Sequence, residues 1–377
     1  MRKKDTAIYG ERRKKFYDWM AREGIALVMF EDTEGRRDLT LRWLTGHPSN
    51  ALLFLSADQR SLLVPWDANL ADLCAQTDLM IPYGEFNRHP LQALKGALEK
   101  LKVPPLSRIE IPPVTSYPLF LDYVGTFTGH DIICRRGGVR KEAEELRAVK
   151  DEGEITILRK GAAVTNGIIA LLEKNVRQGK IKTEADAARF IDTEARRQGC
   201  EGTGFETLAA GSDRSFAIHA FPACTNAPFG GDGFSILDFG IKYRGYTTDV
   251  TITFVRSPSP AQEKIAGLVE KAYRLALSMT KEGVRARDLA AAVDGFFAKY
   301  RKTMPHALGH GIGLEEHEAP ALGNRDDNEW VLRNGMIITL EPGLYDQVHG
   351  GCRLENDLLI TAEGAEPLTS AGIVYLG

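Results

Sequence analysis

The stretch FSILDFGIKYRGYTTDVTITFV, residues 234–255, consists of two apolar, β-branched runs joined by a polar turn. This pattern predicts an antiparallel hairpin. We place the centre of its turn between Tyr243 and Arg244. Asp238 then lies directly opposite Asp249, with the two Cβ atoms about 5 Å apart. Because like charges repel at that distance, the hairpin requires a positive group between the two carboxylates.

A second stretch of the same form follows near the C-terminus, GMIITLEPGLYDQVHGGCRLENDLLIT, residues 335–361. Glu341 and Glu355 are symmetric about Val348 in this stretch, so a hairpin folded there also pairs two carboxylates. The sequence therefore predicts two hairpins, each with its own pair of acids.

The chain before each hairpin is repeated as well. Residues 175–192 (NVRQGKIKTEADAARFID) and 279–296 (MTKEGVRARDLAAAVDGF) both read as a helix end, a glycine turn and an Ala-rich helix. Aligning Ile181 with Val284 gives an offset of 103 residues, which is also the separation of the first acids of the two hairpins. A duplicated unit of helices and strands follows from this match.

Four carboxylates in apolar strands lack an adequate neutralising partner nearby in the sequence. An unpaired charge is costly to bury, and the neighbouring bases, Lys242, Arg244 and Arg353, are too few to balance four acids. Two divalent cations would balance them, and two-metal hydrolases hold their ions about 3.5–4 Å apart. The acids therefore predict a site for two metal ions.

The segment PHALGHGIGLEEHEAP, residues 305–320, contains His306, His310 and His317 within a few residues. It could be a polar loop with exposed histidines or part of a metal site, and the four acids favour the metal site. One imidazole beside four carboxylates favours Mn²⁺, with Co²⁺, Fe²⁺ and Zn²⁺ as alternatives.

Composition excludes several classes of partner. A net charge of −3 gives no electrostatic reason to expect nucleic acid or an anionic membrane. Apolar runs such as NALLFL, residues 50–55, are too short to span a bilayer. The five cysteines are scattered and form no CxxC pair, which indicates a reducing, cytoplasmic location.

Residues 1–137 are expected to form a separate, smaller domain, and residues 138–377 the larger one, with a charged linker between them. Residues 1–20 are basic and predict a helix with a solvated face. The apolar runs that follow predict a sheet with strands at residues 25–30, 41–46, 50–56 and 61–65.

The order of the proposed ligands resembles the five-ligand pattern of the pita-bread metallopeptidases, the group of creatinase, aminopeptidase P, prolidase and methionine aminopeptidase. The ligands in that order are Asp238, Asp249, His310, Glu341 and Glu355. The segments LDFG, TTDVTITF, GHGIGLEEHE, LEPG and RLEND resemble the motifs of this group, and the N-terminal strands resemble its creatinase-type N-domain. The resemblance implies an α+β fold in which duplicated α–β halves surround a curved antiparallel sheet, preceded by a smaller α/β domain.

The resemblance also implies a role for each ligand. Asp249 and Glu355 would bridge two metal ions, His310 and Glu341 would hold one, and Asp238 would chelate the other. Glu341 would serve as general base for a metal-bridging hydroxide. The activity implied is hydrolysis of the peptide bond that precedes proline, by a dipeptidase or an aminopeptidase acting on small peptides, in a homodimer.

Four further residues resemble those that act on the substrate in this group. His219 and His317 would steady the tetrahedral intermediate and the scissile group, and His306 and Arg353 would contact substrate or the ligands. Two alternatives remain at this point: the same metal site acting on a non-peptide small molecule, and a binding module without catalysis. Ala307 and Glu316 depart from the prolidase-like pattern, which leaves the substrate preference open.

Overall fold

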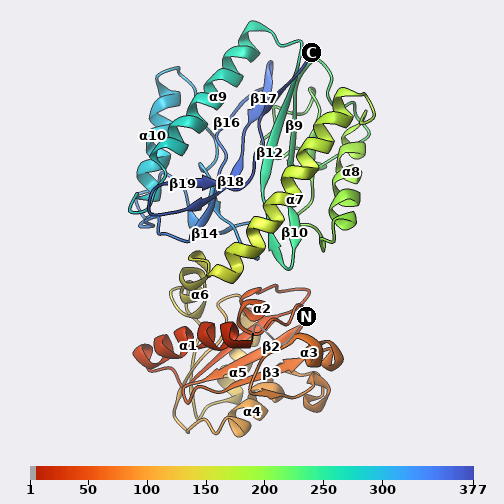
Figure 1. Ribbon diagram of the computed structural model, residues 1–377. Coiled ribbons are helices and arrows are strands. Elements are labelled where there is room, and N and C mark those ends of the chain that lie inside the picture. Colours follow the sequence, from red (N-terminus) through yellow and green to blue (C-terminus); the bar gives the residue numbers. More distant parts are fainter. Residues whose placement is uncertain (1–5) are drawn as a thin grey trace. The chain divides into compact units, whose positions relative to one another are not determined.

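The computed structural model describes residues 6–377, which divide into two compact units, one ending at Leu146 and the other spanning Arg147–Gly377 (Figure 1). The division falls within helix α6 (Val139–Ala148), whereas the sequence places the domain boundary after residue 137. Each unit has its own hydrophobic core.

The first unit is a mixed six-stranded sheet flanked by helices. Its strands in spatial order are β4 (Leu79–Met80), β3 (Ser61–Pro65), β2 (Ala51–Ser56), β1 (Leu27–Asp32), β5 (Arg108–Glu110) and β6 (Asp131–Ile133). Its helices are α1 (Thr6–Glu23), α2 (Thr40–Thr45), α3 (Ala68–Cys74), η2 (Tyr83–Phe86, a 3₁₀ turn), α4 (Pro90–Lys100) and α5 (Tyr117–Thr126). The sheet predicted from the apolar runs is therefore present.

One predicted strand of this unit is wrong, because residues 41–46 form most of helix α2 and its C-terminal cap. The Thr45 hydroxyl donates to the Leu41 carbonyl at 2.7 Å, one helical turn earlier. Gly46 ends the helix with φ of 80°, a conformation that glycine adopts without steric cost. Gly46 was therefore the end of a short helix, and the apolar residues before it were not a strand.

Helix α1 confirms the predicted N-terminal helix but not its fully solvated basic face. Arg12 and Arg13 are buried, and their guanidinium groups donate to the carbonyls of Trp43 and Leu44 at 3.0 and 2.8 Å. The first five residues of the predicted helix lie outside the described part of the chain. Part of the basic face is thus a structural contact with α2.

The second unit repeats one arrangement of two helices and a strand pair. The first half contains α7 (Glu152–Arg177), α8 (Glu184–Arg197), β7 (Gly202–Thr203), β8 (Leu208–Ala210), β9 (Gly233–Phe239), β10 (Ile241–Tyr243), β11 (Tyr246–Thr247) and β12 (Val250–Arg256). The second contains α9 (Pro260–Met279), α10 (Ala286–Ala298), β13 (His310–Gly311), β14 (Glu318–Ala321), β15 (Ile337–Leu340), β16 (Gly343–Asp346), β17 (Gly350–Arg353), β18 (Asn356–Ile360), β19 (Ala365–Pro367) and β20 (Ile373–Leu376). This confirms the predicted duplication.

Each helix pair covers its own half of the strands. Apolar side chains of α7 and α8 pack with those of β9 and β12 in one core, and those of α9 and α10 pack with β15 and β18 in another. Figure 1 shows the two helix pairs on opposite sides of the strands. The strands lie between the helix pairs, and side chains at their ends carry the candidate site.

Helix α7 is the one helix among the described residues that is long and apolar enough to cross a membrane by length and composition. Its buried face, which includes Ile168, Leu172 and Val176, packs into the core of the first half. These are the contacts of a core helix, and they account for its apolar composition.

Candidate metal centre

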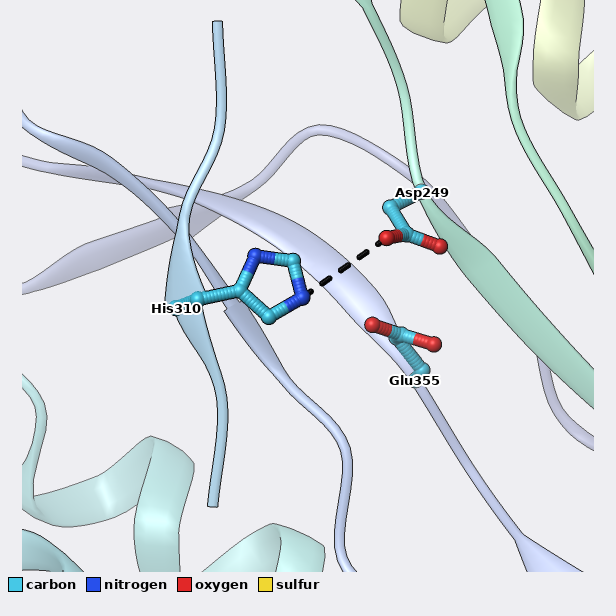
Figure 2. A group of neighbouring side chains, drawn as sticks. All are labelled: Asp249, His310 and Glu355. Atoms are coloured by element: carbon cyan, nitrogen blue, oxygen red, sulfur yellow. Dashed lines mark ion pairs between the residues drawn. The ribbon is translucent and has the colours of Figure 1, made fainter. Parts of the chain in front are cut away.

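The five predicted ligands come from both halves of the second unit. Asp238 lies on β9, Asp249 directly before β12, His310 at the start of β13, Glu341 directly after β15, and Glu355 between β17 and β18. The two halves meet where Glu355 N–H donates to the Thr251 carbonyl at 3.2 Å, a single antiparallel bridge. Figure 2 shows Asp249, His310 and Glu355 pointing toward one another from three separate segments.

The register of the first hairpin differs from the sequence prediction. Asp238 pairs with Thr251 rather than with Asp249, because the turn is centred on Arg244 and Gly245. Both turn residues have positive φ, 52° and 88°, as a tight hairpin turn of type I′ requires. The predicted turn was one residue too early, so Asp249 lies diagonal to Asp238 instead of opposite it.

The predicted register of the second hairpin is confirmed. Gly343 pairs with Arg353 and Asp346 with Gly350, which is symmetric about Val348. Strands β15 and β18 continue the same register beyond the two acids. Glu341 and Glu355 therefore face each other across the hairpin.

The ligand atoms converge without bonding to one another directly. One ligand atom from each of Asp249, His310 and Glu355 lies within 4.8 Å of the others. His310 Nε2 is 3.7 Å from Asp249 Oδ2 and 3.7 Å from Glu341 Oε1. These separations exceed a hydrogen bond, so the groups surround a common position.

The electrostatics of the site fit the binding of cations. Burial, followed by repulsion from the neighbouring carboxylates, raises the pKa of Asp249 and Glu341 well above their usual ranges. Burial and the charge of Asp238 raise the pKa of Glu355 to about 7. Asp238 Oδ1 and Asp249 Oδ1 are buried and have no hydrogen-bond partner among the described residues. Divalent cations would satisfy these oxygens and favour the ionised carboxylates.

Arg353 is the cation that the fold itself supplies. Its side chain is 2% exposed and donates from Nη2 to Asp238 Oδ2 at 2.6 Å. Nη1 donates to the Tyr345 hydroxyl at 2.8 Å and to the Ile218 carbonyl at 3.1 Å. The guanidinium thus joins a ligand to the segment that carries His219, and it neutralises part of the carboxylate charge.

The predicted histidines fall into a half-buried pair, His306 and His310, and an exposed pair, His219 and His317. Burial lowers the pKa of both His306 and His310 to about 4, so both are neutral at pH 7. His306 Nδ1 lies 3.8 Å from Glu341 Oε2. His317 is exposed, with its ring centroid 4.4 Å from that of His310, and His219 is exposed in the turn segment before β9. His219 lies close enough to His306 to lower its pKa, and His306 and His310 both lie 3.7–3.8 Å from Glu341, so the four histidines gather near the carboxylates.

Three residues of the site were missed in the sequence. The Thr251 hydroxyl donates to Glu355 Oε2 at 2.7 Å and accepts from Arg353 Nε at 2.9 Å. Both carboxylate oxygens of Asp357 face the Asp249 N–H, at 3.3 and 3.1 Å, and Tyr345 accepts from Arg353. Thr251 and Asp357 each follow a ligand by two residues, and the period of a strand places such residues on the ligand's face.

Comparison with known proteins identifies relatives of the second unit and of the whole fold. The profile of Metallopeptidase family M24 matches residues 156–362. An uncharacterized peptidase of Methanocaldococcus jannaschii is 32% identical over 62% of the chain, and a Xaa-Pro dipeptidase of Pyrococcus horikoshii is 33% identical over 60%. These alignments span 67% and 63% of the relatives' own lengths.

Two solved structures match nearly the whole chain. The prolidase from Pyrococcus horikoshii superposes with a TM-score of 0.81 at 25% identity, covering 96% of this chain and 99% of that one. The X-Pro aminopeptidase from Thermotoga maritima superposes with a TM-score of 0.82 at 25% identity and the same coverage. The similarity therefore includes the first unit as well as the second.

Proposed function

The chain belongs to metallopeptidase family M24, and we propose that it hydrolyses the peptide bond preceding proline in small Xaa-Pro peptides. The observation that carries this proposal is the convergence of Asp249, Glu341 and Glu355 on the neutral His310 imidazole, with Asp238 close enough to raise the pKa of Glu355. The names of the relatives, Xaa-Pro dipeptidase, prolidase and X-Pro aminopeptidase, support the substrate class.

We propose that the site holds two divalent ions, with Mn²⁺ favoured over Co²⁺, Fe²⁺ and Zn²⁺. His310 and Glu341 would hold one ion, Asp238 the other, and Asp249 and Glu355 would contact both. Support comes from the charge balance and from the orphan oxygens of two of these acids. Metal analysis after gentle purification and Mn²⁺ titration tests the stoichiometry, and an active chain without metal would contradict it.

When bound, two divalent ions lower the pKa of a water and polarise the substrate carbonyl. Glu341, which bound cations would keep ionised, would take the proton of the attacking water at a carboxylate oxygen. His219 and His317 would donate hydrogen bonds to the developing oxyanion or to the leaving nitrogen. Arg353 would hold the carboxylate of Asp238 in place.

The substrate length can be decided by one comparison. An Xaa-Pro bond is a tertiary amide without an N–H, so its hydrolysis depends on protonating the leaving secondary amine. We propose that dipeptides are preferred over longer peptides. The kcat/KM for Ala-Pro, with Mn²⁺ present, should exceed that for Ala-Pro-Ala. A preference for the tripeptide would indicate an aminopeptidase, and no turnover of either would favour a non-peptide substrate.

We also propose a cytoplasmic homodimer. All five cysteines are free in the structure, which fits a reducing compartment. The dimer follows from the family resemblance, and sedimentation equilibrium at micromolar concentration would measure it. A monomer at those concentrations would contradict it.

A further inference from the structure

The two exposed histidines, His219 and His317, lie on segments outside the regular strands. An imidazole on such a segment would sample many positions unless the segment were held from within. Each segment closes over one buried carboxylate, Glu184 under the first and Glu318 under the second.

Glu184 joins the two ends of the segment 211–225, which carries His219. Its side chain is fully buried. Oε1 accepts from the Gly211 N–H at 2.8 Å, and Oε2 accepts from the Thr225 N–H and hydroxyl at 2.8 and 2.6 Å. Oε2 also accepts from Arg214, which donates in turn to the Pro222 carbonyl. Because Glu184 begins helix α8, the segment is tied to a rigid element.

Glu318 closes the segment 311–318 in the same way. Its Oε1 accepts from the Glu315 N–H at 3.1 Å and from Arg147 Nη2 at 2.5 Å. Its Oε2 accepts from Lys150 Nζ at 3.3 Å. Burial alone would raise the pKa of Glu318, but the two cations lower it to about 2, so it is ionised at any pH of interest.

The space around this second carboxylate is closed as well. A Cβ added to Gly313 would come within 2.5 Å of Glu318 Oε2, so the turn of the segment packs directly on the carboxylate. The pairing of Gly311 with Glu318 joins the segment to the strand that begins at His310. His317 is thereby held beside the His310 ring.

We propose that Glu184 and Glu318 are positioning residues, each fixing the segment that presents one substrate histidine: Glu184 for His219 and Glu318 for His317. The proposal rests on the proposed function, since it treats these histidines as substrate contacts. The two clamps share no residue, so each provides the control for the other.

A set of double variants on the Mn²⁺-loaded protein tests the assignment. Glu184→Gln should lower kcat/KM by up to about 100-fold, the cost of misplacing a reacting group by about 1 Å. In a His219→Ala background the same change should cost less than about twofold, because the group that it positions is gone. In a His317→Ala background the full loss should persist.

Glu318→Gln should show the reverse pattern, with its effect lost in His317→Ala and retained in His219→Ala. The matched control is Glu366→Gln, which removes an exposed carboxylate paired with Arg159 on the same unit and should change nothing. An equal loss from Glu184→Gln in both histidine backgrounds would overturn the proposal, because the residue would then act through the fold or the metal site.

A measurement that needs no substrate separates this proposal from the proposed function. In hydrogen exchange of the metal-loaded protein, Glu184→Gln should speed exchange across 212–224 and leave 312–317 unchanged, and Glu318→Gln should do the opposite. These outcomes would support the clamps even if no Xaa-Pro peptide were hydrolysed. Unchanged exchange in both segments would refute them. If a Gln variant fails to fold, Thr225→Val and Lys150→Met each remove one donor from a clamp and give the same contrast.

Discussion

In protein stripped of its metal ions, the free energy of unfolding of the second unit should fall as pH rises from 6.5 to 7.5. A carboxyl whose pKa is raised in the folded state binds more protons there than when unfolded, so stability falls as pH rises toward the folded pKa. Asp249, Glu341 and Glu355 are all of this kind, because they are buried and repel one another. Bound cations would keep all three ionised and remove this dependence.

The half-buried histidines, His306 and His310, set the lower limit of this pH range. The folded pKa of His306 and His310 is lowered to about 4 by burial, so their contribution to stability grows as pH rises from about 4 to their unfolded value near 6.5. Below pH 6.5 this trend opposes that of the acids. Above 6.5 this opposing trend fades within about one pH unit and is worth less than about 1 kcal/mol for both histidines together, so the three carboxyls determine the sign of the slope.

The magnitude follows from the size of each shift. With a folded pKa of about 7, Glu355 should lose less than about 1 kcal/mol of stabilisation between pH 6.5 and 7.5. A group that stays protonated in the folded state across one pH unit loses roughly 1 kcal/mol, which is the upper limit for Asp249 and for Glu341. After the opposing contribution of the histidines, the net loss is about 1–3 kcal/mol, and each kcal/mol corresponds to roughly 2–4 °C in Tm for a unit of this size.

Calorimetry at three pH values measures this loss of stability as a change in Tm. Chelated and Mn²⁺-reloaded protein are compared, and the transition followed is the one whose Tm changes when metal is added. Asp357 is also buried with a raised pKa, but it contributes in both states and cancels in the difference. Glu355→Gln should flatten the slope of the chelated protein, since it removes one titrating group and part of the repulsion on the others. A chelated Tm that stays constant or rises between pH 6.5 and 7.5 would refute the reasoning.

Four substitutions test other parts of the site and the fold. Glu341→Gln should lower both metal occupancy and rate, whereas His219→Ala should spare the metal and lower kcat by roughly 10²–10³; loss of metal in His219→Ala would reassign that histidine to the ions. Arg353→Met should destabilise the chelated protein by about 3–5 kcal/mol in denaturant titrations, because it leaves Asp238 buried without its cation, and a smaller effect on the reloaded protein is expected. Gly309→Ala should lower Tm because the new Cβ would lie 2.1 Å from a backbone carbonyl of β15, and an unchanged Tm would show that the two strands can separate.

The duplication and the proximity of the candidate ligands could be predicted from the sequence, because both follow from the periodicity of strands. Acids in apolar strands stand out against their neighbours, and the symmetry about Val348 correctly set Glu341 against Glu355. The predicted turn of the first hairpin was one residue too early because the turn uses a non-glycine residue, Arg244, at positive φ. Nothing in the composition of the turn identifies that conformation before the strands are paired.

Contacts made across long sequence separations were not predictable in the same way. Arg353 lies 115 residues from Asp238, and Glu318 lies 171 residues from Arg147. Each residue taken alone resembles a solvated charge, as did the basic face of α1. Burial of such a residue is decided by the packing of elements that no local pattern describes. The resemblance already placed Arg353 near the ligands, but its partner Asp238 and the partners of Glu318 emerged only with the structure.

The charge balance of the site argues against the alternative of a binding module without catalysis. The guanidinium of Arg353 contacts Asp238 and lies near Glu341 and Glu355, and the raised pKa values of Asp249, Glu341 and Glu355 indicate that the surrounding protein groups alone do not stabilise their ionised forms. Replacing buried ionic groups by apolar residues of similar volume is often neutral or stabilising, so a protein that only presented a surface would gain by losing them. The arrangement is favourable when cations offset the repulsion, and the exposed histidines at its rim matter only if a substrate is held there. We therefore infer that the proposed metal centre and its two clamped segments belong to one catalytic arrangement.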